Sequence, residues 1–159
     1  MLTPPEYGWT DFFLDGESVY SLGYITDVAM EWLDAAINGL MYDNPFVVKG
    51  FCEPGWMMCA VTTDACRVYF EDAIEPPDIF SMAPDEAYAM DRLAFCRALH
   101  GDMAGHLAEW ANWELYDEEG PEADERRAAR ESALRTRLET LETLIKAEET
   151  EEETDEGEA

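Results

Sequence analysis

Two histidines, His100 and His106, are the first residues to consider as catalytic bases or metal ligands. In a helix their separation of six residues places them about 240° apart around the axis. They therefore do not form the i, i+4 pair that binds a metal on one helical face. His100 also falls on the apolar side of the helix predicted around it, as expected for a histidine that packs in or beside a core. The histidines predict neither a metal site nor a catalytic pair.

Four cysteines, Cys52, Cys59, Cys66 and Cys96, are the next candidates. None belongs to a C-x-x-C pair, so their spacing indicates neither a zinc ribbon nor a thioredoxin-type motif. All four lie in apolar stretches, which favours buried, reduced thiols in a cytoplasmic protein. Nucleophile elbows, phosphate loops and dinucleotide-binding turns are also missing from the sequence. We therefore expect no enzymatic activity, no metal and no cofactor.

Carboxylates are so frequent that a single acidic pair carries little information. The chain contains 37 Asp and Glu residues and only 10 Lys and Arg residues, which gives a net charge of −27. Residues 1–116 hold 20 acidic and 4 basic side chains, and residues 117–159 hold 17 and 6. The predicted folded part is therefore acidic in its own right. Such a surface repels nucleic acid and anionic membranes and attracts basic proteins, although solubility alone, as in halophilic proteins, is the competing explanation.

The composition nevertheless predicts a folded domain. Apolar residues make up 47% of the chain and aromatic residues 12%, which is enough to build a core. No apolar run approaches the roughly 18 residues that would span a bilayer. The first residues lack the basic and apolar regions of a secretory signal, so we expect a cytoplasmic protein.

The elements that must position any functional residue can be predicted from periodicity. Apolar residues recur at three- and four-residue spacing over 26–42, which predicts an amphipathic helix. Residues 46–71 are rich in β-branched and aromatic residues and contain the turns CEPG and TDA, which predicts a three-stranded antiparallel meander. The proline-rich segment 73–84 predicts a loop, and 85–116 a long helix. Residues 1–24 could form two short strands or an irregular lid over the core.

A second strong helix is predicted near the C-terminus, over residues 124–147, after a linker at 117–123. Its apolar residues repeat at intervals of 4, 3 and 4 and form a seam: Leu134, Leu138, Leu141 and Ile145. This pattern is too short to specify a coiled coil. Docking on the parent domain, self-association and docking in a partner's groove all remain open. Residues 148–159 are predicted to be a disordered acidic tail.

The predicted fold is therefore α+β. An antiparallel sheet of three to five strands is packed by two helices within an acidic domain at 1–116, and the C-terminal helix and tail follow.

One set of short patterns resembles a known group of proteins. The segment GYITDVAMEWLDAAINGL, the turn EPGW, the strand CRVYFED and the helix end HLAEWANWELY follow one another between residues 23 and 116. In this they resemble small acidic uncharacterised or immunity-like bacterial proteins, often from actinobacteria. The chain departs from their pattern where Gly55 runs directly into Trp56, and the helix at 124–147 is additional. The resemblance implies an interaction role and assigns no site residues.

Our functional hypothesis is a non-enzymatic inhibitor that neutralises a basic protein, such as a nuclease or another nucleic-acid-binding protein. Carboxylates would occupy a Lys/Arg channel meant for phosphates, in an immunity protein or a phage-encoded anti-defence inhibitor. We expect no direct contact with nucleic acid or membrane. The candidate partner-binding residues are Glu53, Trp56, Glu71, Asp72, Glu75 and Asp78; solvated acidic surface and core packing of the tryptophan are the competing explanations.

An alternative hypothesis is an oligomeric structural or adaptor protein. Here the helix at 124–147 would assemble the chain through its seam, and the charge would only keep the assembly in solution.

Overall fold

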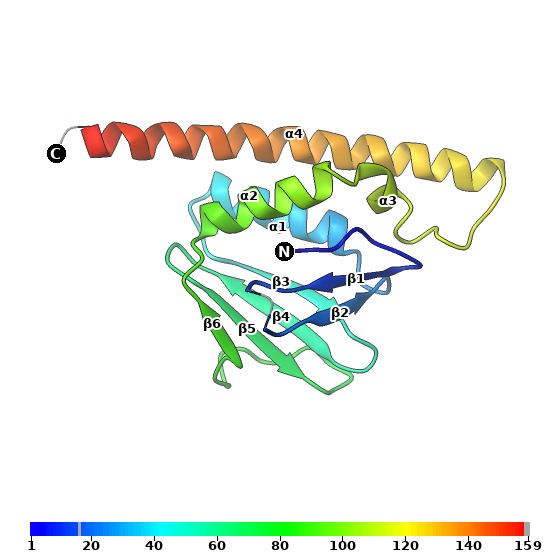
Figure 1. The fold of residues 1–159 in the computed structure, drawn as a ribbon, viewed down its shortest axis with the longest axis horizontal. Coiled ribbons are helices and arrows are strands. Elements are labelled where there is room, and N and C mark those ends of the chain that lie inside the picture. Colours follow the sequence, from blue (N-terminus) through cyan, green and yellow to red (C-terminus); the bar gives the residue numbers. More distant parts are fainter. Residues whose placement is uncertain (16, 158–159) are drawn as a thin grey trace.

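The computed structural model describes the backbone of residues 1–15 and 17–157, and side chains as far as residue 151 (Figure 1). This part of the chain contains two antiparallel sheets and four helices, which confirms the predicted α+β class. The elements in chain order are β1 (Trp9–Phe12), β2 (Tyr20–Gly23), α1 (Val28–Met41), β3 (Phe46–Phe51), β4 (Trp56–Val61), β5 (Cys66–Glu71), β6 (Glu86–Tyr88), α2 (Arg92–Ala104), α3 (Leu107–Ala111) and α4 (Pro121–Gly157).

The larger sheet has the strand order β3-β4-β5-β6 and is antiparallel throughout. Side chains alternate along its strands, so Met57, Cys59 and Val61 of β4 are buried in the core beside α1 and α2. Their neighbours on β4 point to the opposite face, which we call the outer face. Because Trp56 pairs with Glu71 in the β4–β5 register, two predicted site residues lie side by side on that face. The predicted meander is confirmed, and β6 adds a fourth strand.

Residues 1–24 form a hairpin of β1 and β2, which is one of the two predicted alternatives. Phe12 and Leu22 from this hairpin are buried in the common core. The Leu22 side chain packs directly on Gly50 of β3, where a β-carbon would lie only 2.8 Å from it. The hairpin therefore packs on the core face of the large sheet at β3.

The predicted long helix at 85–116 is wrong in its first turns, in its middle and after residue 111. Residues Glu86–Tyr88 are the edge strand β6, because pairing with β5 overrides their helical propensity. Helix α2 starts only after Asp91, whose side chain accepts a hydrogen bond of 2.7 Å from the backbone N–H of Ala94. It ends at Ala104 with Gly105 as its C-cap, and the short helix α3 follows.

Helix α4 is longer than predicted and belongs to the core. It runs from Pro121 to Gly157, and Figure 1 shows it crossing the three shorter helices on the side away from the sheets. All four seam residues are buried in the common core: Leu134, Leu138, Leu141 and Ile145. Of the three alternatives for the seam, docking on the parent domain is the one observed. The helix also continues beyond residue 147, where we expected disorder, and Glu149 forms an ion pair of 2.8 Å with Arg97. Of the predicted tail, residues 158 and 159 lie outside the described residues.

Candidate functional site

Basic side chains of the helices are engaged by carboxylates of the same chain. Eight of the ten Lys and Arg residues form ion pairs within the described residues: Arg92, Arg97, Arg126, Arg127, Arg130, Arg135, Arg137 and Lys146. Several of these pairs fasten α4 to the elements beneath it; Arg137, for example, reaches Asp34 of α1 at 2.8 Å. Part of the acidic charge of the helical layer is therefore neutralised from within, at the places where these pairs join the elements.

The most buried of these pairs joins Arg130 of α4 to Asp27, the N-cap residue of α1. Two guanidinium nitrogens of Arg130 donate to the Asp27 carboxylate at 2.6 and 2.7 Å, and the Glu114 carboxylate lies 3.6 Å from the same guanidinium. Burial and the nearby Asp27 carboxylate raise the pKa of Glu114, although Arg130 opposes the shift. These carboxylates hold the helices together.

Two basic residues lie outside this pattern, and both are on the outer face of the large sheet. Within the described part of the chain, neither Lys49 nor Arg67 has a carboxylate within 4 Å. The Lys49 ammonium lies 5.7 Å from the centre of the Trp56 ring, and Arg67 donates to the Thr62 hydroxyl at 3.3 Å.

Four of the six predicted partner-binding residues come together in one segment. The acidic loop, which we define as residues 71–85, starts on the last residue of β5 and leads into β6. Glu71, Asp72, Glu75 and Asp78 are all exposed on it. Unlike the carboxylates that join the helices, such as Asp27 and Asp34, none of the four takes part in an ion pair with another described residue. Their charge is available to a partner.

The acidic loop is fixed to the sheet by hydrogen bonds at both ends. Near its start, the Trp56 indole N–H donates to the carbonyl oxygen of Ile74 at 2.9 Å. At its end, the Asp85 carboxylate accepts from the backbone N–H of Phe70 at 2.7 Å. Between them, Asp78 accepts from the N–H of Phe80 at 3.1 Å and closes a local turn. Trp56 is half-buried, so it supports the loop from below.

The acidic loop also exposes two large apolar side chains that our sequence analysis missed. Ile74 is 93% exposed and Phe80 96% exposed, the highest values among the large apolar residues described. Apolar residues in a segment with three prolines were a usable signal, because such a segment forms a loop and a loop lies at the surface. Exposed apolar residues among carboxylates are the composition expected of a protein-binding surface, with anchors inside a polar rim.

The remaining predicted residue, Glu53, lies on the turn between β3 and β4 and faces the N-terminal hairpin. Its backbone is in the left-handed region with φ 48°. A β-carbon at Gly23 would lie 2.8 Å from its carboxylate oxygen and 3.4 Å from the Trp9 ring. Glu53 is therefore a neighbour of β1 and β2.

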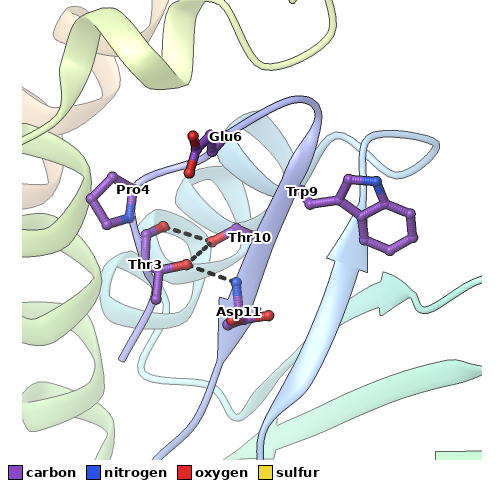
Figure 2. A pocket seen from close by; sticks show the side chains of 6 residues that line it. All are labelled: Thr3, Pro4, Glu6, Trp9, Thr10 and Asp11. Carbon is purple, nitrogen blue, oxygen red and sulfur yellow. Dashed lines mark hydrogen bonds between the residues drawn. The ribbon is translucent and has the colours of Figure 1, made fainter.

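An open pocket of about 470 Å³ lies along the N-terminal segment and β1 (Figure 2). Its walls are Thr3, Pro4, Glu6, Trp9, Thr10 and Asp11. The Thr10 hydroxyl donates to the carbonyl oxygen of Thr3 at 2.6 Å, and the Thr3 hydroxyl accepts from the N–H of Asp11 at 2.9 Å. The Thr3 and Thr10 hydroxyls are also within hydrogen-bonding distance of each other, so their hydrogen bonds are made within the chain. The lining contains no histidine, cysteine or lysine that could serve as a base or nucleophile.

The cysteines are free thiols. Cys59, Cys66 and Cys96 are buried in the core, as the sequence predicted, whereas Cys52 is half-buried. The hydrogen bond with Cys66, together with burial, raises the pKa of Cys59, and burial raises that of Cys96 to about 12. The Cys59 and Cys96 thiols therefore stay protonated at neutral pH, which makes them poor nucleophiles. Among the described residues no three His, Cys, Asp or Glu side chains are arranged to hold a metal ion.

No protein-family model matches the chain, and no curated protein or solved structure is significantly similar to it. The resemblance to immunity-like bacterial proteins therefore stays a prediction. In the part of the chain that the structure describes, no helix has the length and apolar character needed to cross a membrane.

Proposed function

We propose that this protein is a non-enzymatic inhibitor that binds a basic, nucleic-acid-handling protein through its acidic loop. One observation carries the proposal: exposed carboxylates outside any ion pair of the described residues surround two apolar side chains that are almost fully exposed. An immunity protein against a toxin nuclease and a phage-encoded inhibitor of a host defence nuclease are the two roles that fit this chemistry.

The mechanism is competition for a basic groove. Duplex DNA presents one negative charge per about 1.7 Å of axis, and the proteins that handle it line their grooves with Lys and Arg. Glu71, Asp72, Glu75 and Asp78 offer negative charge on a loop that is anchored at both ends. Charge complementarity speeds the encounter. Ile74 and Phe80 then add apolar contacts, which a phosphate backbone cannot imitate and which select one partner.

The alternative, an oligomeric adaptor assembled through α4, has less support. Its seam residues are buried against the chain's own helices, so assembly through them would require α4 to leave the core. Exposing Leu134, Leu138, Leu141 and Ile145 together would cost several kcal/mol, at about 1.5 to 3 kcal/mol for each large aliphatic side chain.

Affinity capture from the organism that encodes the chain, followed by purification of the captured protein, tests the proposal. We expect a basic partner whose binding to the purified chain weakens steeply as salt rises from about 50 to about 500 mM. Duplex DNA should compete for the same site. The double variant Ile74→Ser, Phe80→Ser should lose the partner, whereas Met41→Ser, at an exposed apolar residue on α1, should keep it. An acidic partner, or binding indifferent to both salt and DNA, would contradict the proposal.

A further inference from the structure

Aromatic side chains, three of them exposed, also gather at the open end of the N-terminal hairpin, away from the turn between β1 and β2. We call Tyr7, Trp9, Tyr24 and Tyr116 the aromatic patch. Tyr7 is 75% exposed, Tyr24 41% and Trp9 37%. The rings of Tyr24 and Tyr116 meet edge to face with their centres 5.5 Å apart, although the two residues come from opposite ends of the domain. Aromatic residues at a surface favour binding, because they offer a large contact area and lose little side-chain freedom.

Two glycines hold these rings against the backbone. A β-carbon at Gly8 would lie 2.6 Å from the Tyr116 ring and 2.9 Å from the Tyr24 ring. A β-carbon at Gly23 would lie 2.8 Å from the Glu53 carboxylate and 3.4 Å from the Trp9 ring. The Tyr24 and Tyr116 rings are therefore packed before any partner arrives, which lowers the entropy lost on binding.

Tyr7 occupies a backbone conformation that its residue type disfavours. It has φ 51°, Gly8 has φ 77°, and the flanking residues bond each other in both directions, from Glu6 N–H to Trp9 C=O at 2.8 Å and from Trp9 N–H to Glu6 C=O at 3.0 Å. A two-residue turn of this kind prefers Asn, Asp or Gly at the position of Tyr7. The tyrosine is thus held in strain while its ring is exposed, and such outliers point to function.

The surroundings of the aromatic patch are acidic. Residues 1–48 contain no Lys or Arg. Glu6, Asp11 and Glu53 adjoin the patch, and none of them is in an ion pair with another residue that the structure describes. Burial raises the pKa of Tyr116, and the nearby Asp117 and Glu53 carboxylates add to the shift.

We infer that the aromatic patch binds a guanidinium or ammonium side chain of the partner protein. Aromatic faces attract such cations through their quadrupole, and the Glu53 and Glu6 carboxylates can accept the N–H groups at the rim. The β3–β4 turn joins this site to the acidic loop, because a β-carbon at Gly55 would lie 3.0 Å from the carbonyl oxygen of Glu71. The inference rests on the proposed function for the identity of the partner, and adds that one Arg or Lys of that partner lies against an exposed aromatic ring of the patch.

A peptide probe tests the site without the partner. An acetylated Gly-Arg-Gly-Arg-Gly amide is titrated into the ¹⁵N-labelled chain at about 150 mM salt, beside the same peptide with citrulline in place of arginine. Citrulline keeps the shape of arginine and removes its charge. We expect the largest shifts at the backbone amides of Gly8, Trp9 and Tyr24, and no saturable shifts with citrulline. Shifts centred on the acidic loop instead, or equal binding of the two peptides, would overturn the inference.

Two variants separate aromatic recognition from general charge attraction. Tyr24→Leu with Tyr116→Leu keeps apolar volume but removes two ring faces, and should weaken arginine-peptide binding about tenfold. Tyr7→Asn suits the turn better than tyrosine, so it should fold at least as well and still bind less tightly. The control Glu122→Gln on α4 should change the affinity for the peptide by less than about twofold.

Wild-type affinity for the peptide in both Tyr7→Asn and the double variant Tyr24→Leu, Tyr116→Leu would overturn the inference. If the arginine peptide does not bind but a basic partner is captured and its binding is sensitive to salt, the aromatic site is wrong and the proposed function stands. If the peptide binds but no basic partner is found, the proposed function is wrong and the aromatic site stands.

Discussion

The helical layer and the acidic loop use the same residue types for different purposes. In α4 and the helices below it, the carboxylates at the contacts between elements meet Arg, at distances such as 2.6 Å for Arg130 and Asp27, and the apolar seam residues are buried. In the acidic loop, carboxylates lie outside any ion pair of the described residues, and Ile74 and Phe80 are exposed to solvent. The first arrangement stabilises a fold, and the second leaves charge and apolar surface for another molecule.

This difference shows that net charge alone does not identify a binding surface. The total of −27 includes carboxylates that bind neighbouring elements together. What distinguishes the acidic loop is the combination of carboxylates outside the internal ion pairs with exposed apolar side chains. Substitutions in the helical layer should therefore change stability, and substitutions in the acidic loop should change binding.

The largest effect is expected from Leu138→Asp in the seam. It places a charge in the core between α4 and the shorter helices, and should lower the free energy of unfolding by about 3 to 5 kcal/mol. Denaturant unfolding measures this, with Ser132→Asp at an exposed position of α4 as the control. Equal stability of the two variants would show that α4 does not belong to the core.

The next effect is expected from Arg130→Met, which leaves the Asp27 and Glu114 carboxylates together without their cation. Breaking a largely buried pair on one side should cost about 3 kcal/mol. Arg135→Met removes an exposed pair with Glu131 on the same helix, and should cost no more than about 0.5 kcal/mol. Similar losses of unfolding free energy in both variants would show that the Arg130–Asp27 pair stabilises the fold no more than a surface ion pair does.

In the acidic loop, Phe80→Ser should leave stability within about 0.5 kcal/mol of wild type, because the side chain buries almost nothing. Partner affinity should fall by about 10- to 100-fold, as for an apolar anchor at the centre of an interface. Calorimetric titration with the purified partner, beside thermal unfolding, measures both quantities. A loss of stability would place Phe80 in the core, and unchanged affinity would place the interface elsewhere.

The smallest effect concerns pH and Glu114. Its pKa is raised in the folded protein, so the folded state holds this proton more tightly than the unfolded state does. The resulting stabilisation is present below the ordinary glutamate pKa of about 4.3 and is lost as the pH rises through the folded value. Glu114→Gln should therefore flatten the dependence of unfolding free energy on pH just above that range. Glu125→Gln, at an exposed residue of α4, should leave this pH dependence unchanged. If the unfolding free energies of Glu114→Gln and wild type vary identically with pH, Glu114 does not contribute to the pH dependence of stability.

Much of the fold could be predicted because its patterns are local. Alternation and the turn sequences located the meander, and the 4, 3, 4 spacing identified the seam. The edge strand β6 could not be predicted, because residues 86–88 have helical propensity and become a strand only through pairing with β5. The continuation of α4 beyond residue 147 depends in part on Arg97 and Arg92, which lie about fifty residues earlier in the chain and contact Glu149 and Glu148.

The candidate site could be predicted only in part, for a related reason. Four of its carboxylates lie close together in the sequence, between residues 71 and 78, so a prediction based on charge found them. Nothing in the sequence shows that Glu71 lacks an ion pair and that Asp34 has one, because that difference depends on where each arginine comes to lie. The aromatic patch joins Tyr24 to Tyr116 across the whole domain, so only the folded structure could show it.

The most direct test of the central claim compares two charge-matched variants in binding to the purified partner. One neutralises the acidic loop: Glu71→Gln, Asp72→Asn, Glu75→Gln and Asp78→Asn, which keeps the oxygen that accepts from Phe80. The other neutralises four exposed helical-side carboxylates: Glu119→Gln, Glu122→Gln, Glu125→Gln and Glu139→Gln. Stopped-flow mixing at about 50 mM salt should show the loop variant associating about tenfold more slowly, with little change in dissociation, and the helical variant within about twofold of wild type. Equal rates for the two variants would mean that only total charge matters, and would contradict the assignment of partner binding to the acidic loop.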